Sequence, residues 1–250
     1  MSVSPLEALL KRDRLVIGAA LVLLTVLAWA YLFSIGGEMA AMPGMNMMTP
    51  SLTFAMWAIM MVGMMTPSAA PMILIYARVA RDAAVRGQPF ASAGWFAGGY
   101  LLSWTVFALI AAAGQGLLER AALLTPAMSL ASRQIGGAIL IVAAVYQWTP
   151  LKDSCLSQCR NPLIFIQQHG GFSRTVSGSL KLGFQHGVYC IGCCWTLMTL
   201  LFVVGVMNFL WIAGLAILVL LEKAVPPGRL IGRIASFGFA AFGLWLLANG

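Results

Sequence analysis

The chain has 250 residues, of which 61% are hydrophobic and 9% are charged, and its mean hydropathy is +0.91. Soluble domains are about half apolar and about a quarter charged, so this composition excludes a soluble globular protein. The formal net charge is +8, but the basic residues are spread along the chain and form no compact patch, so nucleic-acid binding is not expected. We predict an all-α protein, a polytopic bundle of transmembrane helices, with residues 1–250 forming a single transmembrane domain.

The predicted spans follow from the apolar segments, because a helix needs about 20 apolar residues to cross a bilayer. Seven spans are predicted, with six as the alternative, because the fifth and sixth segments are joined at Asn208 and could form one bent element. The first segment is long for a signal peptide and no small-x-small cleavage site follows it, so it is expected to be retained. The predicted spans cover residues 15–35, 52–76, 90–114, 134–148, 182–207, 209–221 and 231–247.

The basic residues predict the orientation of these spans. With the N-terminus inside, 13 of the 15 basic residues fall on inner segments, and only Arg120 and Arg133 fall outside. Inner loops of membrane proteins carry an excess of Lys and Arg, so this distribution favours an inside N-terminus.

Methionine is concentrated in one part of the chain, since 11 of the 15 residues lie between Met39 and Met72. The first group occupies the predicted Met-rich outer loop at 36–51. Thioether sulfur is a soft donor that suits copper(I), and it keeps this ability in an oxidising compartment where thiols are lost to disulfides. The candidate metal ligands of this loop are Met42, Met45, Met47 and Met48.

The second group continues along the second predicted span. Met56, Met60 and Met64 are spaced by four residues, which places them on one helix face. They are candidate ligands for a metal that crosses from the outside, although methionine also packs well between helices. Pro67 and Pro71 follow, and they are expected to kink or break this helix.

All five cysteines and both histidines lie between residues 155 and 194. Part of the set shares one face of the fifth predicted span, and the rest lies in a predicted inner Cys/His loop at 150–182 that would have to fold back onto this helix. The inner compartment is reducing, so the thiols stay available for copper(I) or zinc, unless they are small buried packing residues. The candidate ligands are Cys155, Cys159, His186, Cys190, Cys193 and Cys194.

Three segments resemble a bacterial family of predicted metal-binding integral membrane proteins of unknown function. They are the MMTPSAAP end of the second span, the TPLKxxCLxxCRxP segment from Thr149 to Pro162, and the GxxxGxxCxGCCW segment from Gly183 to Trp195. The resemblance covers about residues 50–250. It implies metal binding through the Met, Cys and His positions and a multi-pass location in the bacterial cytoplasmic (inner) membrane, but it names no metal and no reaction.

Groups for catalysis are sparse. The acidic residues flank the spans or open the outer loop, and the sequence contains no nucleotide-binding motif and no nucleophile with a base, so we expect no enzyme. The main hypothesis is copper(I) transport or delivery from the outer Met loop along the second span to the cysteines, with a metallochaperone or membrane-complex partner. The alternatives are a structural or assembly subunit of a larger membrane complex, with a structural metal or none, and a thiol redox protein that uses Cys190 and Cys193.

Overall fold

The computed structural model describes residues 5–41, 49–87, 91–125 and 128–249, with the side chains of the first helix described from residue 15 to residue 37. Apart from an isolated bridge between Leu124 and Leu130, the regular structure in these ranges is helical, which confirms the all-α class. The helices are α1 (Pro5–Ala41), α2 (Pro50–Val85), α3 (Ala93–Arg120), α4 (Arg133–Tyr146), α5 (Pro150–Arg160), α6 (Pro162–Gln168), α7 (Val176–Thr199), α8 (Leu201–Val204), α9 (Phe209–Ala224) and α10 (Gly228–Ala248).

Five of these helices are long and apolar enough to cross a membrane: α1, α2, α3, α7 continued by α8, and α10. The count rises to six if α4 and α5, which are bent by 64° relative to each other, form one broken span. Each of the seven predicted segments corresponds to a helix, but α4 has 14 residues and α9 has 16, short of the length of about 20 that a crossing needs. The membrane-protein class is thus supported, while seven spans and an inside N-terminus stay predictions.

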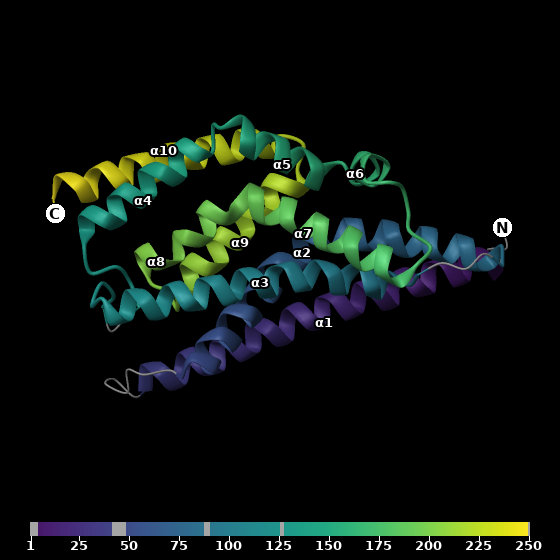
Figure 1. Ribbon diagram of the computed structural model, residues 1–250, viewed down its shortest axis with the longest axis horizontal. Coiled ribbons are helices and arrows are strands. Elements are labelled where there is room, and N and C mark those ends of the chain that lie inside the picture. The colour runs from purple at the N-terminus through teal and green to yellow at the C-terminus, as the bar shows by residue number, and fades with distance from the viewer. Residues whose placement is uncertain (1–4, 42–48, 88–90, 126–127, 250) are drawn as a thin grey trace.

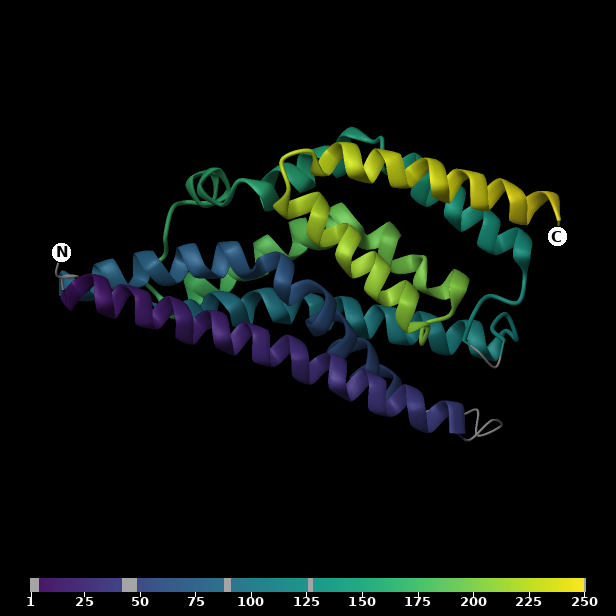
Figure 2. The same ribbon diagram turned by 180° about the vertical axis from the view of Figure 1, so that it is seen from behind.

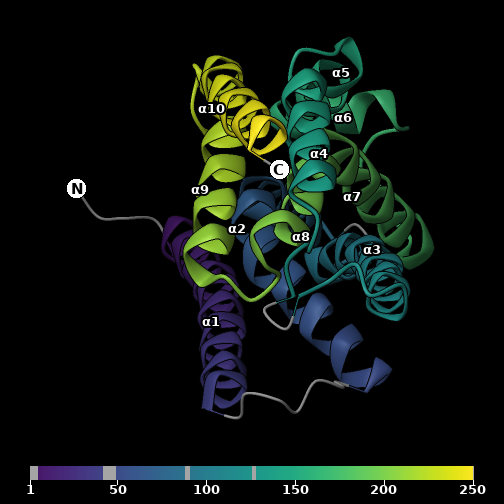
Figure 3. The same cartoon turned by 90° about the vertical axis from the view of Figure 1, so that its left-hand side faces the viewer.

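The helices run back and forth along the long axis of the molecule. The start of α1 and the end of α10 lie at opposite ends of that axis (Figures 1 and 2). Seen from the end, α2 lies near the centre, with α1 on one side, α3 and α7 on the other, and α4, α5 and α10 above them (Figure 3). The exposed side chains are largely apolar, as in Leu23, Leu109 and Phe237, which fits a surface covered by lipid.

The central helix α2 runs unbroken through Pro67 and Pro71. Its direction changes near the middle, which Figure 2 shows, so the prolines bend the helix and do not end it. Side chains take up backbone carbonyls next to the first proline, because the Thr66 hydroxyl donates to Val62 O at 2.6 Å and the Ser68 hydroxyl donates to Met65 O at 2.9 Å. The carbonyls that Pro67 and Pro71 leave without a helical donor are those of Gly63 and Pro67, so these two bonds lie beside the freed carbonyls and do not replace the missing bonds.

Glycines allow α3 and α7 to approach closely. A Cβ added at Gly183 would lie 2.9 Å from the carbonyl carbon of Phe96, and one added at Gly187 would lie 2.8 Å from Cβ of Ser103. On α3 the close contact is made by Gly99, whose added Cβ would lie 2.9 Å from the carbonyl carbon of Leu180. Small residues at such positions let membrane helices pack backbone against backbone.

A buried ion pair connects α5 to α9. Lys152 and Glu222 are 3% and 1% exposed, and Lys152 Nζ lies 2.8 Å from Glu222 Oε2. Lys152 also donates to the side chain of Gln147. Arg160, at the end of α5, donates to the carbonyl of Val225 at 2.9 Å, so α5 is held at both of its ends. This attachment keeps the two cysteines of α5 against α7.

Candidate metal centre

The candidate centre lies around Cys190, in the middle of α7. Its side chain is 1% exposed. Lys223 Nζ, from the last turn of α9, donates to Cys190 Sγ at 2.8 Å. The Tyr100 hydroxyl, from α3, lies 3.1 Å from the same sulfur and donates to Met65 O of α2 at 3.1 Å. Four helices therefore meet at one thiol.

The remaining cysteines lie near Cys190. Cys193 and Cys194 are buried, and their thiols donate to Cys190 O at 3.1 Å and 2.9 Å. The thiol of Cys159, on α5, interacts with the side chains of Cys190 and Cys193. Cys155 contacts the same helix, because a Cβ added at Gly192 would lie 2.8 Å from Cys155 Sγ. The predicted inner loop thus folds back as a helix, and the five cysteines lie on or against α7 without forming a disulfide.

These thiols lie close together, but they do not have the geometry of a metal site. Within the described residues, no group of three or more Cys, His, Asp or Glu side chains has the geometry to hold a metal ion. The reason is local, since Cys193 and Cys194 both turn toward a backbone carbonyl of their own helix. The buried sulfur donors match the chemistry of copper(I), but binding requires these side chains to rotate away from that carbonyl.

His186 lies one turn before Cys190 and is enclosed by aromatic rings. Its side chain is 3% exposed, and its ring centroid lies 5.0 Å from that of Phe165, 5.8 Å from that of Tyr100 and 5.9 Å from that of Phe96. Its Nδ1 atom is buried without a hydrogen-bond partner. Buried polar atoms are nearly always paired, so an unpaired nitrogen at this position is a candidate metal ligand.

The methionines of α2 are turned into the core. Met56 and Met60 are fully buried, and Met64 is 1% exposed. The stripe reaches the thiols through the next turn, because Ser68, four residues after Met64, accepts a hydrogen bond of 3.3 Å from the same Lys223 Nζ that contacts Cys190. The predicted loop ligands Met42, Met45, Met47 and Met48 lie outside the described residues.

Sequence reasoning missed Tyr100, Ser68 and Lys223. The sequence does carry a signal for Lys223, since Glu222 and Lys223 directly follow the apolar segment 209–221, but by itself this signal only places them next to a predicted span. Tyr100 and Ser68 carry no comparable signal, because nothing in their local sequence separates them from ordinary membrane-helix residues.

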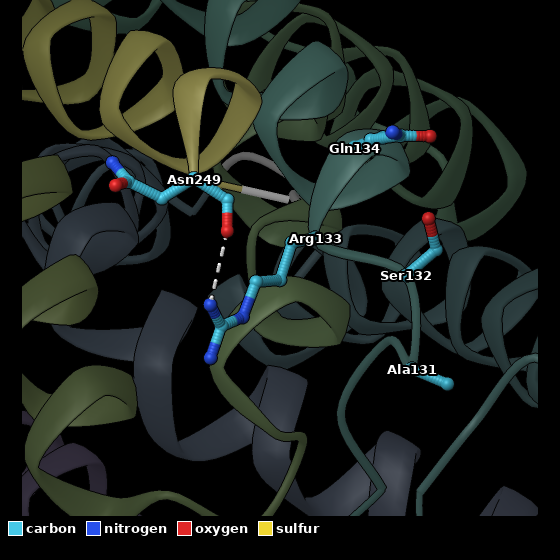
Figure 4. A pocket seen from close by; sticks show the side chains of 5 residues that line it. All are labelled: Ala131, Ser132, Arg133, Gln134 and Asn249. Atoms are coloured by element: carbon cyan, nitrogen blue, oxygen red, sulfur yellow. Dashed lines mark hydrogen bonds between the residues drawn. The ribbon is translucent and has the colours of Figure 1, made fainter.

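Two pockets lie away from the cysteines. A polar one of about 420 Å³ is formed where α4 begins and α10 ends, and there Arg133 Nη1 donates to Asn249 O at 3.2 Å (Figure 4). An apolar one of about 620 Å³ lies beside α3 and α7 and is lined by residues such as Trp57 and Met198. Neither pocket is lined by a cysteine or a histidine.

Comparison with known proteins supports a metal-related assignment. The family model PpoB2, described as a copper chaperone, matches residues 54–246, which span α2 to α10. The chain belongs to this copper chaperone family. No curated protein and no solved structure matches it. The matched residues include both the methionine stripe and the cysteine cluster, so the expected relation to copper is supported. The metal ligands and a role in membrane transport stay predictions.

Proposed function

We propose that the protein is a membrane-embedded copper(I) carrier, not an enzyme, that delivers the ion by way of its methionine and cysteine side chains. Copper(I) would be captured at the outer loop, pass along α2, and reach the thiols of α7 and α5. The observation that supports this path most directly is the meeting of α2 and α7 at Tyr100 and Lys223, which link the methionine helix to Cys190.

The chemistry of the two donor types favours a direction along this path. Thioethers are neutral and hold copper(I) weakly, whereas thiolates hold it tightly, so an ion is drawn from the methionines toward the cysteines. If 13 of the 15 basic residues face the cytoplasm, the thiols lie at the inner, reducing side, where they stay reduced. A metallochaperone or a larger membrane complex would then exchange the ion with the carrier.

The proposed ligands are tested by metal binding to the full chain in detergent under anaerobic, reducing conditions. We expect the wild type to bind at least one copper(I) per chain. The Cys190→Ser, Cys193→Ser double variant should lose at least tenfold in affinity in competition with a copper(I) chelator. The Met56→Leu, Met60→Leu, Met64→Leu variant should still bind copper(I) at the cysteines. In reconstituted vesicles, copper(I) added outside should reach the cysteines more slowly than in the wild type.

Met198→Leu is the matched control, because Met198 is a buried methionine of α7 outside the stripe. It should behave as the wild type, since Leu and Met have similar volumes. A wild-type chain that binds no copper(I), or binding that neither set of substitutions reduces, would contradict the proposed function.

A further inference from the structure

The amino group of Lys223 lies among sulfur atoms. Its Nζ contacts Cys190 Sγ at 2.8 Å and Ser68 Oγ at 3.3 Å, and Cys193, Cys159 and Cys194 also act on it electrostatically. The neighbouring carboxylate of Glu222 is engaged by Lys152 at 2.8 Å. Within the described part of the chain, Lys223 forms no ion pair with a carboxylate, so sulfur is the main partner of its charge.

The thiols near Lys223 raise a question of metal specificity. Four cysteines, Cys159 of α5 and Cys190, Cys193 and Cys194 of α7, act on this amino group. Sets of four thiolates are a common zinc site in proteins, and they also suit cadmium. A thiol cluster without an added positive charge would therefore not favour copper(I) over divalent ions by charge.

A fixed ammonium group supplies such a preference. The energy of repulsion between two charges rises in proportion to each charge, so a divalent ion beside Lys223 is repelled twice as strongly as a monovalent one. The effect is larger in a buried site than in water, because the surroundings screen the charges less. The ammonium lies 2.8 Å from Cys190 Sγ, so an ion bound to this sulfur would lie next to the charge.

We propose that Lys223 is a specificity-determining residue, whose positive charge beside Cys190 admits a singly charged soft ion and excludes divalent ions such as Zn²⁺ and Cd²⁺. This inference rests on the proposed function, because it assumes that the thiols bind the transported metal. It assigns to α9 a role in metal selection that neither the methionines nor the cysteines perform.

The test compares Ag⁺, a redox-inert monovalent ion, with Cd²⁺ on the purified full-length chain in detergent. Affinities are measured by titration against a chelator, with the ultraviolet charge-transfer absorption of metal thiolates as the readout. In Lys223→Met the affinity for Cd²⁺ should rise at least tenfold relative to that for Ag⁺. In Lys223→Arg, which keeps the charge, the ratio of the two affinities should stay within threefold of the wild type.

Lys181→Met, at an exposed position near the start of α7, is the matched control for loss of one positive charge and should leave the ratio unchanged. Lys223→Gln replaces Lys223→Met if the latter does not elute as a single peak in size-exclusion chromatography. An unchanged ratio in the uncharged variant, or an equal change in Lys223→Arg, overturns the role of Lys223 while Ag⁺ binding by the wild type still supports the proposed function. A wild type that binds no Ag⁺ overturns both.

Discussion

The Tyr100 hydroxyl connects the backbone of α2 to a thiol of α7. It lies 3.1 Å from both Met65 O and Cys190 Sγ. Each of these atoms has a second partner, Ser68 for the carbonyl and Lys223 for the sulfur, so removing the hydroxyl leaves neither atom unpaired. The loss of stability on removing the hydroxyl should therefore be close to the contribution of one ordinary hydrogen bond.

We expect Tyr100→Phe to lower the free energy of unfolding by about 1 kcal/mol and to weaken Ag⁺ binding severalfold, because Cys190 is then held less firmly. Thermal unfolding in detergent and Ag⁺ titration measure the two effects. Tyr31→Phe, at an exposed position on α1, should change neither. A Tyr100→Phe chain that binds Ag⁺ as the wild type does would show that the hydroxyl does not position the thiol.

Residue spacing predicted one part of this cluster and left out another. His186, Cys190 and Cys194 lie on one helix, and the periodicity of a single helix is enough to place them on one face. Lys223 and Tyr100 come from α9 and α3, and their approach to Cys190 depends on how those helices are shifted along α7. Hydrophobic periodicity says nothing about that shift, so these partners became evident only from the packed fold.

At the scale of elements, the contact between α3 and α7 depends on the absence of side chains. Gly183→Ala places a methyl group 2.9 Å from the carbonyl carbon of Phe96, and a backbone atom cannot move aside as a side chain can. We expect a loss of about 1–3 kcal/mol in stability, visible as a lower melting temperature in detergent. Gly114→Ala, also on a long helix but with open space around its added Cβ, should be neutral or stabilising. Equal melting temperatures for the two variants would contradict this packing.

The attachment of α5 to α9 depends on the ion pair between Lys152 and Glu222. Removing one partner leaves a buried charge uncompensated, so Lys152→Met should cost about 3–5 kcal/mol. The double variant Lys152→Met, Glu222→Met removes both charges and should recover much of that loss, since an apolar pair of similar volume often replaces a buried ion pair well. Thermal unfolding of the three chains measures the coupling. If the stability lost in the double variant equals the sum of the losses in the two single variants, the two side chains do not act as a pair.

The elements show what local sequence can and cannot predict. The apolar segments gave the positions of the long helices, because about 20 apolar residues in succession are a strong local signal. The prolines of α2 were expected to kink or break the helix, and the structure shows the milder outcome, with Thr66 and Ser68 occupying backbone carbonyls near the bend. The predicted inner loop is instead mostly helical, in α5 and α6. The polar sequence of α5 does not indicate a buried helix, because Lys152 is buried only through its pairing with Glu222, which lies 70 residues away in the sequence.

At the scale of the whole molecule, the two kinds of sulfur donor lie at different places along the long axis. The cysteines lie where α5, α7 and the end of α9 meet. The methionine stripe begins nearer one end of this axis, where α2 starts (Figure 1). If the protein is oriented by the positive-inside rule, the thioethers face the oxidising side and the thiols face the reducing side. Thioethers remain able to bind metal in an oxidising compartment, and thiols stay reduced in a reducing one.

The placement of the ends of the chain makes this orientation testable. The start of α1 and the end of α10 lie at opposite ends of the long axis (Figures 1 and 2). If this axis crosses the membrane, the seven predicted spans place the two ends of the chain on opposite sides. We expect a fluorescent protein that folds only in the cytoplasm to be bright when fused to the N-terminus and dark when fused to the C-terminus. Alkaline phosphatase, which is active only outside, should be active at the C-terminus. Matching signals from both ends would contradict seven crossings and indicate an even number, as in the six-span alternative.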